Sequence, residues 1–352
     1  MMLFPTSVVG SLPRPAFVLD LINGRPPLSP DEYERRMEAA VRYAVALQEQ
    51  AGIDVVTDGE WWRKSYIGVI AELAHGFELG TFPDGRPFTI VVDKLSPKTP
   101  GFIAQEVTFL KTIAQRRIKS TLPSPALLGE RMWNKEKSAK AYPKREDFVR
   151  ACVPVLQREL ELIRDAGADV AQIDDPHLCL FVDPDVRKQY ADPDGAAAFA
   201  VDMVNEVVGG IKGIEIAVHL CRRAGARARG EHSHGGGYGP IIGHLNRLQV
   251  QHLTMEFTSP QAGDMAVFKE LRPDFGIGLG CVDVTPGQID SAETIAGRVK
   301  QALKHLPANR ITLNPDCGFA PGSGAVVSID EAYQKLRNEA EAAQMLRSEI
   351  SK

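Results

Sequence analysis

Two short stretches of the chain are nearly identical, and each one joins the end of a helix-like pattern to a strand-like run. Residues 51–55 read AGIDV, and residues 166–170 read AGADV. In each, a glycine follows a helical pattern, as is common where a helix ends in a left-handed residue. Because the same sequence of helix end, glycine and strand occurs twice, the chain is expected to alternate helices with strands. Such alternation is typical of parallel sheets with right-handed crossovers.

The helix before the first copy has clear start and stop signals. Ser29 begins the sequence SPDE, which supplies an N-cap, a proline in the first turn and a glutamate three residues on. We expect this helix to end at Gly52 and a strand to occupy 54–60. Before the second copy we expect a helix over 150–166, followed by a strand over 169–176.

Eight strands are expected in all, separated by helical segments. They are Thr6–Ser11, Asp54–Glu60, Ile118–Pro123, Asp169–Pro176, Glu215–Cys221, His252–Phe257, Phe275–Asp283 and Ile311–Gly318. Eight units over this length favour an α/β fold of the closed (β/α)₈ barrel type, and a doubly wound open sheet is the main competitor.

One stretch interrupts the alternation. Residues 77–92 read as a β-hairpin with an Asp-Gly turn, which we interpret as an excursion from a barrel loop. No linker rich in Ser, Gly or Pro divides the chain. The sequence therefore predicts a single domain over 1–352.

Composition excludes several classes of protein. The formal net charge is −4, which argues against nucleic-acid binding driven by net positive charge. No apolar run approaches the roughly 20 residues that span a bilayer, and the first residues lack the pattern of a signal peptide. Five cysteines are too few for a disulfide framework in a chain of 352 residues. We expect reduced thiols, no membrane partner and a cytoplasmic location.

Polar or reactive side chains stand at the ends of most of the expected strands. They are Ser11, Asp58, Glu60, Asp174, Asp175, His219, Cys221, Glu256, Asp283, Asp316 and Cys317. Barrel enzymes build their active sites from these carboxyl ends. Strand ends also become polar simply because they return to solvent, which explains one or two carboxylates but not a histidine and two cysteines at one level.

The histidine and the cysteines indicate a metal site. Side chains alternate along a strand, so His219 and Cys221 project from the same side of one strand. Cys317 and Glu256 end two other strands. Two thiolates, an imidazole and a carboxylate suit tetrahedral zinc. Zinc keeps a bound thiol ionised and nucleophilic at neutral pH, so alkylation of a thiol is the predicted reaction class.

Other candidates favour a structural interpretation. We expect Cys152 and Cys281 to be core residues, since cysteine is often buried. The glycine-rich loop that holds His232, His234 and His244 is expected to be solvated rather than a ligand cluster.

Six motifs, taken together and in this order, are similar to those of a known family: VVGSLPRP (8–15), DGEWWR (58–63), QIDDP (172–176), HLC (219–221), MEFTS (255–259) and NPDCGF (314–319). The chain resembles the catalytic C-terminal barrel of cobalamin-independent methionine synthase and the short stand-alone members of that superfamily. This resemblance spans nearly the whole chain and implies a (β/α)₈ barrel.

The resemblance also implies roles for individual residues. His219, Cys221, Glu256 and Cys317 match the family's zinc ligands. Ser11 matches a serine that holds the amino-acid substrate, and Glu60 and Asp174 match carboxylates that bind the amino group of homocysteine. The implied activity is zinc-dependent transfer of a methyl group to homocysteine, giving methionine.

The methyl donor is less constrained by the resemblance. The long enzymes carry Asp-Ile-His where this chain has Asp283, Val284 and Thr285. We predict a catalytic role for Asp283. Because the histidine assists proton delivery in the long enzymes, its absence favours a corrinoid donor, free or on a corrinoid protein, over methyltetrahydrofolate. Trp133 is expected either to stack on a pterin or to cap the barrel.

Two alternative functions remain open from the sequence. The first is an epoxyalkane:coenzyme M transferase, or the related lyase, in which Arg63, Arg222 or Arg223 would anchor a sulfonate. The second is a non-catalytic barrel whose zinc is structural. The oligomeric state is not constrained by the sequence.

Overall fold

The structure is a computed structural model that describes residues 2–81, 87–222, 234–320 and 327–350. Three features considered in the sequence, the hairpin turn at 82–86, Arg223 and His232, lie outside these residues.

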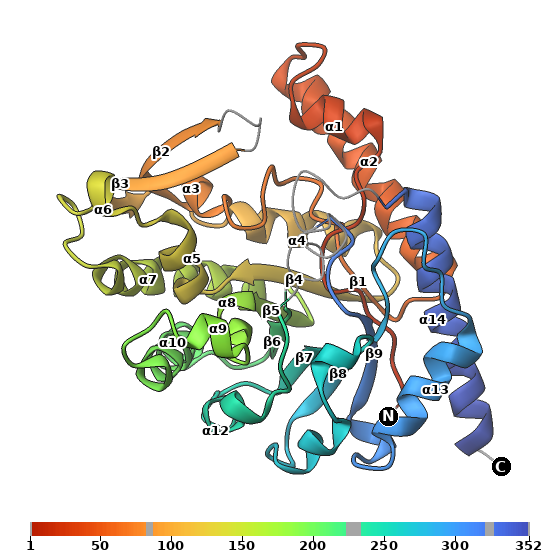
Figure 1. Cartoon of the computed structure of the whole chain (residues 1–352). Coiled ribbons are helices and arrows are strands. Elements are labelled where there is room, and N and C mark those ends of the chain that lie inside the picture. Colours follow the sequence, from red (N-terminus) through yellow and green to blue (C-terminus); the bar gives the residue numbers. More distant parts are fainter. Residues whose placement is uncertain (1, 82–86, 223–233, 321–326, 351–352) are drawn as a thin grey trace.

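A curled parallel sheet forms the centre of the molecule (Figure 1). Within the described residues it has seven strands in the order β1-β4-β5-β6-β7-β8-β9. Their bounds are β1 Val55–Val56, β4 Arg117–Pro123, β5 Val170–Asp174, β6 Glu215–Leu220, β7 His252–Glu256, β8 Gly276–Val282 and β9 Ile311–Pro315. Every neighbouring pair is parallel, so all the carboxyl ends meet at one rim.

The expected first strand closes this sheet into a barrel through only a few residues. Ser7 donates its N–H to the carbonyl of Leu313 in β9 at 3.0 Å, and Leu313 donates to Pro5 at 2.8 Å. On the other side, Val55 of β1 donates to Thr6 at 3.0 Å. Both edges of the seven-stranded sheet are thus joined by one short segment. The closed α/β barrel predicted from the sequence is confirmed, although the first strand is reduced to isolated bridges.

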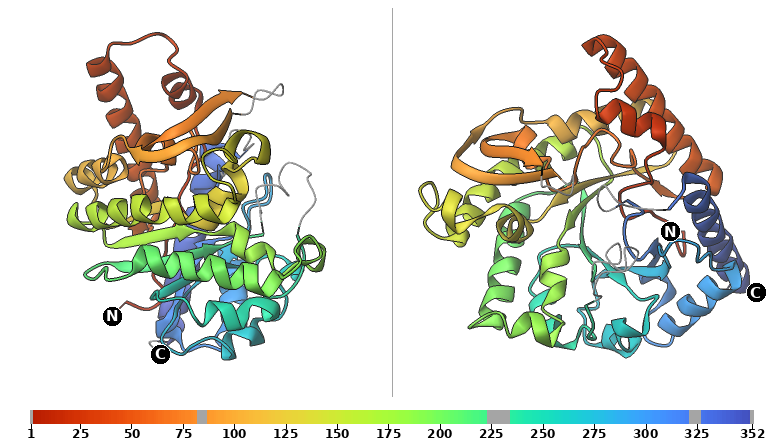
Figure 2. Two further views of the ribbon diagram at one scale, coloured as in Figure 1. Left: turned by 90° about the vertical axis from the view of Figure 1, so that its left-hand side faces the viewer. Right: turned by 45° about the horizontal axis from the view of Figure 1, so that its top comes forward.

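Helices surround the barrel on its outer face, as the two views of Figure 2 show. Their bounds are α1 Ala16–Ile22, α2 Pro30–Ala51, α3 Ile70–Leu73, α4 Phe102–Ile113, α5 Pro125–Met132, α6 Lys135–Ser138, α7 Arg145–Asp165, α8 Pro176–Leu180, α9 Pro184–Arg187, α10 Pro193–Val208, α12 Ile242–Leu245, α13 Ala292–Ala302 and α14 Ile329–Ile350. In the part of the chain that is described, no helix is both long and apolar enough to cross a membrane.

Local sequence signals account for the ends of these elements. In α2 the Ser29 hydroxyl accepts the N–H of Glu32 at 3.3 Å, and Gly52 ends the helix with φ 92°. Helix α7 begins five residues before the predicted start, at Arg145. Strand β1 is shorter than expected because the backbone turns at Gly59 and Glu60, which both have positive φ.

The predicted hairpin is present and lies outside the barrel, beside α6 (Figure 1). Strands β2 Ala74–Thr81 and β3 Pro87–Pro97 pair in antiparallel fashion, with an irregularity between His75 and Phe77. It is therefore an excursion from the loop after β1.

Candidate active site

A cavity of about 270 Å³ lies at the carboxyl ends of the strands. Six of the eight site residues predicted from the sequence line it: Ser11, Glu60, Asp174, His219, Cys221 and Cys317. They come from parts of the chain that are far apart in sequence. The barrel brings them together because parallel strands end at a common rim.

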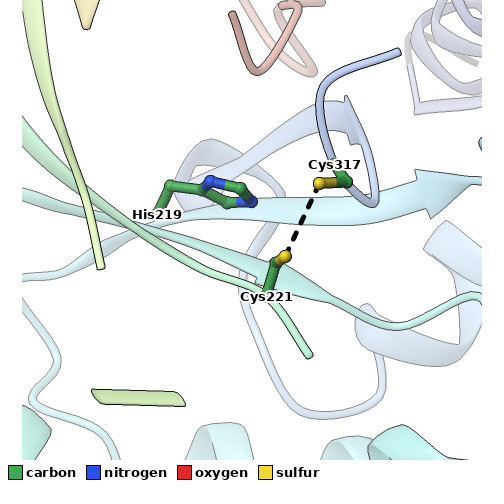
Figure 3. A group of neighbouring side chains, drawn as sticks. All are labelled: His219, Cys221 and Cys317. Carbon is green, nitrogen blue, oxygen red and sulfur yellow. Dashed lines mark hydrogen bonds between the residues drawn. The ribbon is translucent and has the colours of Figure 1, made fainter. Parts of the chain in front are cut away.

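Three of the predicted metal ligands form a compact group in this cavity (Figure 3). His219 lies near the end of β6, Cys221 directly follows that strand, and Cys317 follows β9. Their ligand atoms all lie within 4.8 Å of one another, and all three residues are buried. The two sulfur atoms are 3.5 Å apart. Two thiolates on one tetrahedral zinc, each bound at about 2.3 Å, would lie about 3.8 Å apart, which is close to this separation.

The hydrogen bonds of His219 also fit a metal ligand. Its Nδ1 contacts Oδ1 of Asp174 at 3.2 Å. Its Nε2 is buried and has no hydrogen-bond partner among the described residues. A metal-binding imidazole characteristically bonds a carboxylate through one nitrogen and the metal through the other. The site therefore leaves free the nitrogen that a metal would use.

Without a metal, His219 and Cys317 hold protons that a metal would have to displace. Burial tends to lower the pKa of His219, but the hydrogen bond with Asp174 and the nearby sulfur of Cys221 outweigh it and raise that pKa to about 10. The hydrogen bond with Cys221, together with burial, raises the pKa of the Cys317 thiol well above its usual range. Metal binding to such a group releases protons, so its affinity rises with pH.

The fourth predicted ligand, Glu256, is buried at the end of β7 but lies outside this compact group. Its Oε2 accepts the backbone N–H of Arg222 at 2.9 Å. Glu256 is thus next to the chain that carries Cys221, and its role as a ligand stays a prediction.

Glu60 is held in the cavity by an unusual backbone conformation. Its φ is 58°, a left-handed value that costs a residue other than glycine of order 1 kcal/mol or more. Its N–H donates to Oδ1 of Asp58 at 3.0 Å, and its Oε1 accepts the hydroxyl of Thr121 at 2.9 Å. A Cβ on Gly10 would lie 2.5 Å from Oε1 of Glu60, so this approach requires glycine.

Burial also changes the ionisation of Glu60. It raises the pKa of that carboxyl to about 7; nearby Arg63 opposes this effect, and Asp174 and Asp58 reinforce it. Glu60 and Asp174 are thus two buried carboxyl groups in one cavity, an arrangement that favours binding of a cation.

Ser11 fixes the loop that carries Cys317. Its hydroxyl accepts the N–H of Ala320 at 3.2 Å, and its carbonyl accepts the N–H of Phe319 at 2.9 Å. A Cβ on Gly318 would lie 2.3 Å from the Ser11 hydroxyl oxygen. Ser11 therefore lines the cavity and also joins the first and last strand regions at the rim.

Two residues considered for the methyl donor lie elsewhere. Asp283 is half-buried, its Oδ1 accepts the N–H of Thr285 at 2.7 Å, and it is not among the described residues that line the cavity. Trp133 is partly buried and donates its Nε1–H to the carbonyl of Tyr142 at 2.9 Å. It also does not line the cavity, so the structure gives it a packing role.

Several cavity residues were not predicted from the sequence. His234, expected in a solvated loop, lines the cavity and bonds Asp183 at 2.9 Å. Tyr66 and Arg131 also line it, on the segment after β1 and on α5. No motif marked these residues, because their positions depend on how loops fold over the rim.

The arginines proposed as sulfonate anchors are engaged elsewhere. Arg63 is buried and forms a 2.5 Å ion pair with Glu106. Arg222 donates to the carbonyl of Gly236 and packs on the ring of Tyr238. Neither lines the cavity.

Comparison with known proteins gives the family to which the chain belongs. The sequence model of the family described as "Cobalamin-independent synthase, Catalytic domain" matches residues 4–345. Methionine synthases of Saccharolobus solfataricus and Pyrococcus horikoshii are 26% and 25% identical, over 99% of this chain and 97% and 95% of their own.

Solved structures have the same fold. A B12-independent methionine synthase from Shewanella sp. W3-18-1, in complex with selenomethionine, matches with a TM-score of 0.80 at 23% identity over 99% of both chains. A putative vitamin-B12 independent methionine synthase from Listeria monocytogenes matches with a TM-score of 0.73 at 23% identity, over 98% of both chains. On the family match, which covers nearly its whole length, the chain belongs to the cobalamin-independent synthase catalytic-domain family.

Proposed function

We propose that this protein is a zinc-dependent methyltransferase that moves a methyl group to the thiol of homocysteine and forms methionine. The observation that carries the proposal is the juxtaposition, in one cavity, of the group His219, Cys221 and Cys317 with the carboxyl groups of Glu60 and Asp174. The first set suits a thiol bound to zinc, and the second suits an ammonium group. Homocysteine carries both.

The zinc would be held by His219, Cys221 and Cys317, with Glu256 proposed as a fourth ligand. When bound, zinc supplies a Lewis acid that keeps the substrate sulfur ionised. Asp174 accepts the Nδ1–H of His219 and so leaves Nε2 available to the metal. His219, Cys221 and Cys317 are all buried, and electrostatic interactions are stronger in such surroundings than in water.

The amino-acid end of homocysteine would bind at Glu60, Asp174 and Ser11. Both carboxyl groups are buried, so an ammonium group between them relieves their mutual repulsion. Glu60 has a left-handed backbone, and its side chain lines the cavity rather than facing solvent.

The alternative functions are less well supported. The relatives reported above are described as methionine synthases, and Arg63 and Arg222 do not line the cavity, so an epoxide-opening reaction with coenzyme M is not favoured. A purely structural zinc does not require a cavity with two buried carboxyl groups beside it.

The residues described above concern the thiol acceptor and do not identify the methyl donor. The corrinoid donor predicted from Thr285 gets no support from the comparisons, since the family is described as cobalamin-independent. Asp283 remains a proposed catalytic residue, although it is not among the described residues that line the cavity.

We also propose that residues 1–352 work as one catalytic barrel in the cytoplasm. None of the five cysteines forms a disulfide and all are buried, as suits a reducing compartment.

The function is tested by an anaerobic assay of zinc-loaded protein with homocysteine. Methyltetrahydrofolate and methylcobalamin are supplied in separate reactions, and methionine is measured. The proposal predicts methionine with at least one donor, and no methyl-coenzyme M when coenzyme M replaces homocysteine as the acceptor. Methylation of coenzyme M but not of homocysteine would contradict it.

A further inference from the structure

A line of buried polar side chains connects the interior of the barrel to the proposed zinc ligand His219. Lys119 in β4 donates its Nζ–H to Oε1 of Gln172 in β5 at 3.3 Å. Gln172 donates its Nε2–H to Oδ1 of Asp174 at 2.8 Å. The same Oδ1 lies 3.2 Å from Nδ1 of His219. All four side chains are buried.

The charge of Lys119 determines which way the amide of Gln172 points. Burial lowers the pKa of Lys119 to about 8, so at neutral pH it keeps its proton and acts only as a donor. Its Nζ also donates to the carbonyl of Val8 at 2.6 Å. Gln172 must therefore turn its oxygen to Lys119, which leaves its NH₂ group for Asp174 and for the carbonyl of Val9. A flipped amide would have to place its NH₂ group against the ammonium.

The orientation of the Gln172 amide affects the proposed metal ligand His219. Because Gln172 donates to Oδ1 of Asp174, that oxygen is fixed in place and can accept the Nδ1–H of His219. Once a metal displaces the proton on Nε2, the imidazole keeps its other proton on Nδ1 and offers the Nε2 lone pair to the metal. If the amide were reversed, its oxygen would face Oδ1 of Asp174 at hydrogen-bonding distance, and two acceptors would repel each other.

We propose that Lys119 and Gln172 are positioning residues that set the affinity of His219 for zinc through Asp174. Neither residue lines the cavity, so neither touches the substrate. The inference rests on the proposed function, because it assumes that His219 binds zinc. It adds two residues from the interior of the barrel that no resemblance assigned to the site.

The test measures zinc affinity by competition with a chromophoric chelator in the purified full-length protein. Lys119→Met removes the donor that orients Gln172. Gln172→Glu keeps the volume and the contact with Lys119 but cannot donate to Asp174 when ionised. Each change is expected to weaken zinc binding about 10- to 100-fold, as is typical for residues that orient metal ligands.

Lys335→Met is the matched control. Lys335 is also a buried lysine, with its Nζ donating to the carbonyl of Thr285 at 2.6 Å and paired with Glu331 at 3.0 Å, away from the cavity. It is expected to lose folding stability like Lys119→Met but to bind zinc as the wild type does. If Lys119→Met does not fold, the near-isosteric Gln172→Glu decides the question.

The outcomes separate this inference from the proposed function. Wild-type affinity in Gln172→Glu and in any folded Lys119→Met protein would overturn the positioning role alone. An equal loss of affinity in Lys335→Met would overturn it too, because the loss would then reflect general destabilisation. Wild-type protein that binds no zinc would overturn the proposed function as well.

Discussion

Glu60 combines a left-handed backbone, a buried carboxyl group and a place in the cavity wall, and its proposed partner is the ammonium group of homocysteine. Replacing it with Gln removes the charge and keeps the shape. A charge-assisted hydrogen bond contributes about 1.5–3 kcal/mol, so Glu60→Gln should weaken homocysteine binding about ten- to a hundredfold, measured by calorimetry on zinc-loaded protein. Glu130→Gln, an exposed carboxyl group on the same cavity, is the control and should change little.

The pH dependence gives a second measurement on the same variant. Because burial raises the pKa of Glu60 to about 7, its carboxyl group is largely neutral below that pH and ionised above it. Wild-type affinity for homocysteine should therefore fall as the pH drops through 7. Release of the thiol proton of homocysteine changes the affinity of the wild type and of Glu60→Gln alike. The pH profile of wild-type affinity should therefore show one additional step near pH 7 that the profile of Glu60→Gln lacks. Identical pH profiles would remove Glu60 from the amine site.

Asp174 has two roles in the structure, whereas the sequence predicted one. It lines the cavity with Glu60, and it bonds Nδ1 of His219. Asp174→Asn should therefore weaken both homocysteine and zinc binding, the latter about 10- to 100-fold, while Glu60→Gln should leave zinc affinity unchanged. Chelator competition on the two variants side by side checks this. Unchanged zinc affinity in Asp174→Asn would show that the contact with His219 does not matter for the metal.

At the scale of elements, the sequence predicts helix ends that depend on neighbouring residues. It does not predict strand lengths or loop positions that depend on contacts between distant segments. Ser29 and Gly52 mark the ends of α2 because caps depend on a few neighbouring residues. The first two strands are shorter than predicted, since their backbone turns early to bring Ser11 and Glu60 to the rim. His234 was missed for a related reason, because its place in the cavity wall depends on contacts with Asp183 in another loop.

The C-cap of α2 gives a direct test of this local encoding. Gly52 has φ 92°, and an added Cβ would meet Ala340 of α14 at 3.0 Å. Gly52→Ala should therefore destabilise the fold by about 1 kcal/mol or more. Gly297→Ala, in the middle of α13 where an added Cβ meets nothing within 4 Å, should instead be neutral or stabilise by up to about 1 kcal/mol. Denaturant unfolding of both variants makes the comparison, and equal effects would contradict it.

At the scale of the whole molecule, closure of the barrel makes the site. Cys221 and Cys317 are 96 residues apart in sequence and have their sulfur atoms 3.5 Å apart. This contact could be inferred from the sequence because both cysteines end strands of a predicted parallel barrel. The position of Glu256 outside the compact group could not, because it depends on side-chain orientation at the end of β7.

The central claim is that His219, Cys221 and Cys317 hold a zinc ion that binds the sulfur of homocysteine. Zinc K-edge X-ray absorption of the purified protein, with and without homocysteine, tests it most directly. The account predicts about one zinc per chain with two sulfur ligands near 2.3 Å, and a third sulfur ligand when homocysteine is added. Cys317→Ser should lose one sulfur or the metal itself. A zinc with no sulfur ligands, or a sulfur count unchanged by homocysteine, would contradict the account.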